Sequence, residues 1–66
     1  MPSKQDIQNF RTAVEVGDDS TVSELADEMP MDVLKKALTR CECLVRITGD
    51  YQSTRDIVLG ALNNKT

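Results

Sequence analysis

Few side chains in this chain could carry out chemistry. The 66 residues include two cysteines and no histidine, so the residue that most often acts as a general base near neutral pH is missing. Cys43 is the strongest candidate nucleophile, because Arg40 and Arg46 would lie about one helical turn away on either side, and nearby cations favour the thiolate. Catalysis by this thiolate would still need a partner base. We therefore predict no catalytic residue and no enzyme activity.

The carboxylates are the second group that could bind a ligand. The stretch from Thr12 to Leu34 holds seven acidic residues and no basic one. A calcium-binding EF-hand loop needs a glycine at its sixth position and a glutamate at its twelfth. A loop that starts at Asp18 or Asp19 has neither. We therefore expect no metal site and no cofactor.

The same acidic stretch could instead bind another protein. Part of its charge would stabilise the starts of helices, where negative groups are favourable. The remainder predicts an acidic surface that docks on a basic protein surface, because the layout of charge steers association. The residues that we assign to this surface are Asp18, Asp19, Asp27 and Glu28.

The next twelve positions reverse the sign of the charge. They contain four basic residues, with Glu42 as the only acidic one. A basic helix face of this kind is typical of a recognition helix in the DNA major groove. The chain as a whole is acidic, with a net charge of −3 and a pI of about 4.7, which disfavours nucleic acid without excluding it. The candidate nucleic-acid face consists of Lys36, Thr39, Arg40 and Arg46.

Helix signals divide the chain into four segments, which we predict at about 4–16, 21–29, 30–48 and 53–63. Three of them begin with a hydroxyl residue followed three positions later by an acid, the spacing of a capping box. These pairs are Ser3 with Asp6, Thr21 with Glu24, and Ser53 with Asp56. Gly17 and Gly49 are expected to end helices, and Pro30 to separate the second from the third.

The long third segment carries the clearest apolar periodicity. Its apolar residues occupy one arc of a helical wheel, which predicts a buried stripe: Val33, Leu34, Ala37, Leu38, Cys41, Leu44 and Val45. We therefore predict one all-α domain over residues 1–66 with a long central third helix. Because sharp corners join its helices, we expect orthogonal, helix-turn-helix-like packing rather than a regular bundle.

The segment from Thr21 to Leu38 resembles the first two helices of a helix-turn-helix and the small N-terminal domain of bacterial translation initiation factor two. The matching residues are Thr21-Val22, Glu24-Leu25-Ala26, Lys35-Lys36 and Leu38. The segment departs from the pattern at Pro30, which replaces the usual turn glycine, and at Lys36 and Thr39, where a recognition helix buries apolar residues. The spacing to the lysine pair is also about three residues short of the initiation-factor domain. The resemblance covers 18 of 66 residues, and no function is carried over from it.

Several apolar residues remain after each helix has been assigned an inward face. Isolated exposed apolar residues are ordinary, but several on one small domain indicate a partner. We expect stable association, with a homodimer as the simplest case. The apolar interface candidates are Met31, Cys43, Ile47, Tyr51 and Leu59.

These observations favour a small acidic helical module that binds a larger protein as a regulator, inhibitor or adaptor, without chemistry of its own. One alternative is a dimeric helix-turn-helix-like DNA-binding regulator that uses the basic face of the third helix. A second alternative is a structural subunit of an assembly. The polar N-terminal residues and the absence of a long apolar run predict a cytoplasmic protein that does not contact a membrane.

Overall fold

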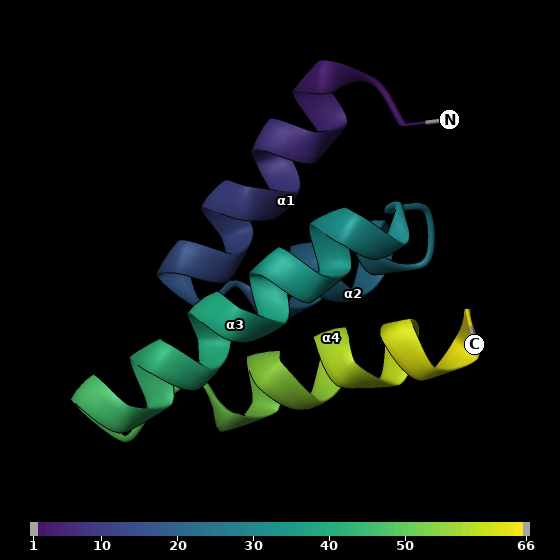
Figure 1. Cartoon of the computed structure of the whole chain (residues 1–66). Coiled ribbons are helices and arrows are strands. Elements are labelled where there is room, and N and C mark those ends of the chain that lie inside the picture. Colours follow the sequence, from purple (N-terminus) through teal and green to yellow (C-terminus); the bar gives the residue numbers. More distant parts are fainter. Residues whose placement is uncertain (1, 66) are drawn as a thin grey trace.

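A computed structural model describes residues 2–65 of the chain, and within this range it contains four helices and no strand. The helices are α1 (Lys4–Val16), α2 (Asp19–Ala26), α3 (Met31–Thr48) and α4 (Gln52–Asn64) (Figure 1). The all-α prediction is confirmed, and α3 is the longest helix, as expected. The bounds of α1 agree with the prediction. Helix α3 begins one residue later than predicted, α4 extends one residue further at each end, and α2 differs most.

Helix α1 begins and ends at the residues that the sequence indicates. The Ser3 hydroxyl accepts a hydrogen bond from the Asp6 backbone N–H at 3.1 Å, and the Asp6 carboxylate accepts one from the Ser3 N–H at 3.3 Å. This reciprocal pair satisfies two donors that have no partner within the helix. At the other end Gly17 has a φ of 73°, a left-handed conformation that glycine adopts without a steric cost.

Helix α2 starts earlier than predicted, and the capping box at Thr21 and Glu24 is wrong. Asp18 is the N-cap: its carboxylate accepts hydrogen bonds from the Thr21 N–H at 3.4 Å and from the Thr21 hydroxyl at 2.8 Å. Asp18 takes this position because its side chain reaches a free donor three residues ahead. The helix also ends at Ala26, and residues 27–29 form a turn before Pro30.

Helix α4 begins without the predicted cap. Tyr51 is its N-cap residue, with a left-handed φ of 74° and no capping side-chain hydrogen bond. The predicted pair of Ser53 and Asp56 does not cap the helix, because α4 begins at Gln52 and Ser53 lies within its first turn. The Ser53 hydroxyl donates to Asp19 of α2 at 2.5 Å.

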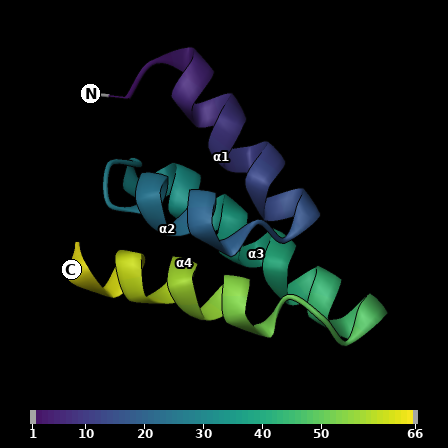
Figure 2. The same ribbon diagram turned by 180° about the vertical axis from the view of Figure 1, so that it is seen from behind.

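The four helices pack unequally. Figures 1 and 2 show α3 and α4 side by side, running in opposite directions, with α2 against both α1 and α4. Helix α1 runs in roughly the same direction as α3, approaches it at the C-terminal end of α1 and diverges from it toward the N-terminus. The helix-turn-helix character of this packing stays a prediction.

The core lies where these helices meet. The predicted stripe of α3 faces it: Leu34, Ala37, Cys41 and Leu44 are buried, and Val33, Leu38 and Val45 are half-buried. The largest fully buried side chains from the other helices and the α2–α3 turn are Phe10, Val14, Val22, Met29 and Val58. Thr54 is the one buried polar side chain among residues 2–65. Burial of this apolar surface supplies the main driving force for folding.

Candidate functional site

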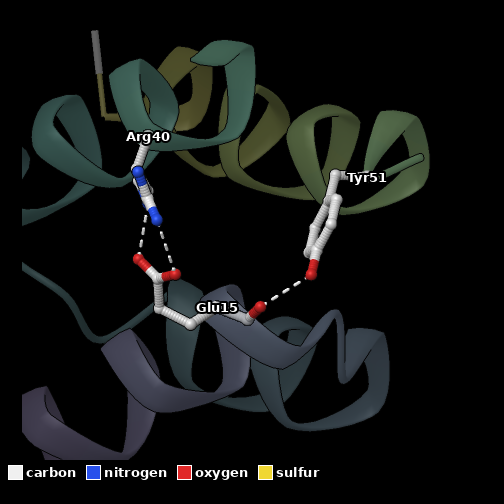
Figure 3. A network of polar contacts seen from close by, with 3 residues as sticks. All are labelled: Glu15, Arg40 and Tyr51. Atoms are coloured by element: carbon white, nitrogen blue, oxygen red, sulfur yellow. Dashed lines mark hydrogen bonds and ion pairs between the residues drawn. The ribbon is translucent and has the colours of Figure 1, made fainter. Parts of the chain in front are cut away.

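A polar network ties the C-terminal end of α1 to α3 and to the α3–α4 connection. The Arg40 guanidinium donates two hydrogen bonds to the Glu15 carboxylate, from Nε to Oε1 at 2.7 Å and from Nη2 to Oε2 at 3.1 Å. The Tyr51 hydroxyl donates to the Glu15 backbone carbonyl at 2.7 Å. Figure 3 shows both contacts converging on Glu15. Two residues remote in the sequence thus fix the end of α1.

The ion pair shifts both of its members toward the charged form. The hydrogen bond from Arg40 lowers the pKa of Glu15, an effect that burial partly opposes, and the same contact raises the pKa of Arg40. The two side chains remain about half exposed, at 48% for Glu15 and 49% for Arg40. Arg40, which the sequence places on a nucleic-acid face, therefore has an intramolecular partner.

An open groove of about 400 Å³ lies between α1 and α3. Its apolar floor consists of Ile7, Val14, Val33 and Ala37. Its charged residues are Arg11, Glu15, Lys36 and Arg40. We call this the basic groove, because it has three cations and a single carboxylate, which is already paired with Arg40.

A second hollow of about 420 Å³, more open than the first, lies on the other side of α1, against α2. Among its lining residues are Val16, Leu25, Asp18 and Glu24, and none of its lining residues is basic. Val16 is 69% exposed. We call this the acidic hollow. Helix α1 thus separates two concave surfaces that carry opposite charge.

The four residues predicted to form an acidic surface have different roles. Asp18 caps α2, although its side chain remains exposed at the acidic hollow. Asp19 accepts hydrogen bonds from the Ser53 and Thr54 hydroxyls, which lower the pKa of Asp19. Asp27 and Glu28 are exposed in the turn after α2 and form no ion pair within residues 2–65. The structure therefore leaves Asp18, Asp27 and Glu28 accessible, while Asp19 joins α2 to α4.

The apolar interface candidates also fall into two groups. Ile47 is 71% exposed and Leu59 is 39% exposed, and Cys43 is exposed as well. Met31 and Tyr51 are half-buried. The Tyr51 ring packs against Gly17, where a Cβ would lie 3.4 Å from the ring atom Cε1. Tyr51 therefore contributes to the interior contacts of the molecule.

The remaining residues of the predicted nucleic-acid face are all exposed on α3. Lys36 is exposed and lines the basic groove. The Thr39 hydroxyl donates to the Lys35 carbonyl one turn earlier, at 3.1 Å. Arg46 is exposed near the C-terminal end of α3.

The two cysteines lie in different environments. Cys41 is in the core, and its burial raises the pKa of its thiol, which disfavours the nucleophilic thiolate. Cys43 is exposed, and its neighbour Arg40 is engaged with Glu15. Within residues 2–65 no cluster of three or more metal-ligating side chains occurs. No helix in that range has the length and apolar character needed to cross a membrane.

No family model matches this chain, and searches of curated proteins and of solved structures find no match.

Local patterns place Glu15 in the acidic stretch and Val16 among the outward apolar residues, but they assign neither of them, nor Arg11, to a binding surface. Glu15 and Arg40 are 25 residues apart in the chain, and no local spacing indicates that they pair. Val16 could be recognised as an outward apolar residue at the end of its helix, but its position beside Asp18 and Glu24 depends on how α1 meets α2.

Proposed function

We propose that the protein is a small helical protein-binding module, a regulator, inhibitor or adaptor that occupies a surface of a larger protein in the cytoplasm. The observation that carries this proposal is the acidic hollow, where the exposed Val16 side chain lies among carboxylates and no cation is present in the lining. A concave surface with apolar and acidic groups suits a partner segment that presents apolar and basic side chains.

The two kinds of residue would have separate roles in binding. Burial of Val16 and of the half-buried Leu25 would supply affinity, because apolar contacts at the centre of an interface account for most of its binding free energy. Glu24, and beyond it Asp27 and Glu28, would attract and orient the basic partner. The Lys65 ammonium donates to the Asp27 backbone carbonyl at 3.2 Å. This places one positive charge close to Asp27.

The DNA-binding alternative uses the opposite side of the molecule. Its basic residues on α3 would contact phosphates, but Arg40 already forms an ion pair with Glu15. The two hypotheses respond oppositely to a change of charge on α2. A Glu24→Lys substitution should weaken binding to a basic protein and strengthen binding to DNA.

The test is affinity capture from the native host with the intact protein as bait, followed by measurement of Kd for each captured protein. A partner that uses the acidic hollow should bind the Val16→Lys/Glu24→Lys variant at least about tenfold more weakly, since an apolar contact is lost and attraction becomes repulsion. Circular dichroism checks that the variant is folded. Glu42→Lys is the matched control, because Glu42 is an exposed carboxylate on α3.

Equal capture of the same proteins by the wild type and the double variant would exclude the acidic hollow as the binding site. A gel-shift titration of duplex DNA at low and high salt addresses the alternative. A salt-sensitive shift that Arg46→Glu abolishes would favour DNA binding instead.

A further inference from the structure

We propose that the basic groove between α1 and α3 is a second docking site, which binds an acidic amphipathic helix of another protein. This inference deepens the proposed function, because it would make the module an adaptor with two sites of opposite charge. It rests on different residues and predicts a partner of the opposite sign, so the two proposals can fail independently.

The shape of the groove suits a short helical segment. Its lining extends from Ile7 to Glu15 on α1 and from Val33 to Arg40 on α3, which corresponds to about 12 Å and about 10 Å along the two helices. This length matches roughly two turns of an added helix. Helices α1 and α3 diverge toward the N-terminus of α1 (Figures 1 and 2), and the half-buried Ile7 and Val33 side chains line the groove on either side.

The charge of the groove indicates a partner with carboxylates. Arg11 and Lys36 are exposed on opposite walls, and neither forms an ion pair with any residue in the range 2–65. The charge of Arg11 attracts the Glu15 carboxylate only from beyond ion-pair distance. Arg40 is held by Glu15 yet remains half exposed. An acidic segment would place carboxylates opposite Arg11 and Lys36, because complementary charges orient a partner and exclude competitors.

The apolar floor distinguishes a protein helix from other anionic partners. Val14 and Ala37 form its base, with Ile7 and Val33 beside them. A nucleic acid would use the cations but leave this apolar surface in water, whereas the apolar face of an amphipathic helix would cover it.

The experiment uses the full chain and a labelled synthetic peptide of about 15 residues, long enough to form a helix, with leucines on one face and glutamates on the other. We expect saturable binding in fluorescence anisotropy. Arg11→Glu/Lys36→Glu should weaken it by about tenfold, since two exposed attractive contacts become repulsive. Arg46→Glu, an exposed cation of α3 that does not line the groove, is the matched control and should bind like the wild type.

Further measurements locate the contact. Methyl NMR signals of Ile7, Val14 and Val33 should shift on binding, because these side chains line the groove. The Val16→Lys/Glu24→Lys variant should bind the peptide as well as the wild type does, so a defect in the acidic hollow is separated from one in the basic groove.

Four results would overturn the proposal. They are no binding of the peptide, equal binding of a scrambled peptide of the same composition, equal weakening by Arg46→Glu, and methyl shifts confined to other residues. Concentration-dependent dimerisation of the wild type that is lost in Arg11→Glu/Lys36→Glu would show instead that a second copy occupies the groove. Displacement of the peptide by a fatty acid, with unchanged methyl shifts, would assign the groove to a small anionic lipid.

Discussion

Asp19 shows how an acidic residue that suggests a binding surface can instead hold the fold together. Its carboxylate accepts hydrogen bonds from Ser53 and from the buried Thr54 hydroxyl. A hydroxyl buried without a partner is costly, so Thr54 depends on Asp19 for an acceptor. Asp19 therefore joins α2 to the first turn of α4.

We predict that Asp19→Ala lowers the free energy of unfolding by about 1–3 kcal/mol, because it leaves the buried Thr54 hydroxyl without an acceptor. Thr54→Val should cost less, since it removes the buried hydroxyl itself and so leaves no buried donor that requires an acceptor. The double variant should then be less destabilised than the sum of the two single variants. Urea denaturation measures all three values.

The control is Asp32→Ala, which removes an acid from the first turn of α3. It should cost only about 0.3–1 kcal/mol, the usual value of a charge near a helix N-terminus. If Asp19→Ala lowers the free energy of unfolding by no more than this control, the hydrogen bonds from Ser53 and Thr54 to Asp19 do not stabilise the fold.

Helix α4 contains a residue that its packing does not require. Gly60 lies within the helix, and a Cβ added there would meet no atom within 4 Å. Glycine in a helix is less favourable than alanine because the unfolded chain loses more conformational freedom. Gly49 differs, since its φ of 78° ends α3 in a left-handed conformation.

We expect Gly60→Ala to stabilise the protein by about 0.5–1 kcal/mol, with an increase in Tm of roughly 2–8 °C for a domain of this size. Gly49→Ala should lower the Tm, because alanine adopts the left-handed conformation only with strain. Thermal unfolding followed by circular dichroism tests both. A lower Tm for Gly60→Ala would mean that α4 packs at this position.

The whole molecule combines short helices, an aliphatic core and two polar links between distant segments. Glu15 and Asp19 provide those links, and hydrogen bonds to their charged forms lower the pKa of each carboxyl group. A carboxyl group whose pKa is lower in the folded state stabilises the fold at pH values above its unfolded pKa. This stabilisation is lost as the pH falls through the folded pKa.

We therefore predict that these two groups give Tm no pH dependence near neutral pH, and that Tm falls once the pH drops below their ordinary pKa values of 4.5 for Glu15 and 3.8 for Asp19. Glu15→Gln/Asp19→Asn should be less stable than the wild type at pH 7 and should lose less stability between about pH 5 and pH 2, a range that includes both values. If the wild type and the double variant lose the same stability over this pH range, Glu15 and Asp19 are not the source of the pH dependence.

Local signals along the chain were sufficient to predict four helices, the capping box at Ser3, the stop at Gly17 and the inward stripe of α3. Each depends on residues within about one helical turn, where backbone geometry alone sets which groups meet. The predictions at Thr21 and Ser53 were wrong because both helices begin earlier, so that each residue lies inside its helix. Asp18 caps α2, and the Ser53 hydroxyl bonds to Asp19 of another helix.

The surfaces required the folded chain. Arg11 of α1 and Lys36 of α3 both line the basic groove, and Val16 of α1 and Glu24 of α2 both line the acidic hollow. Sequence spacing defines the faces of a single helix, whereas the angle at which two helices meet depends on the fit of all their buried side chains. The chain's charge pattern thus predicted that acidic and basic regions exist, and the packing of α1 between them decided which residues share a surface.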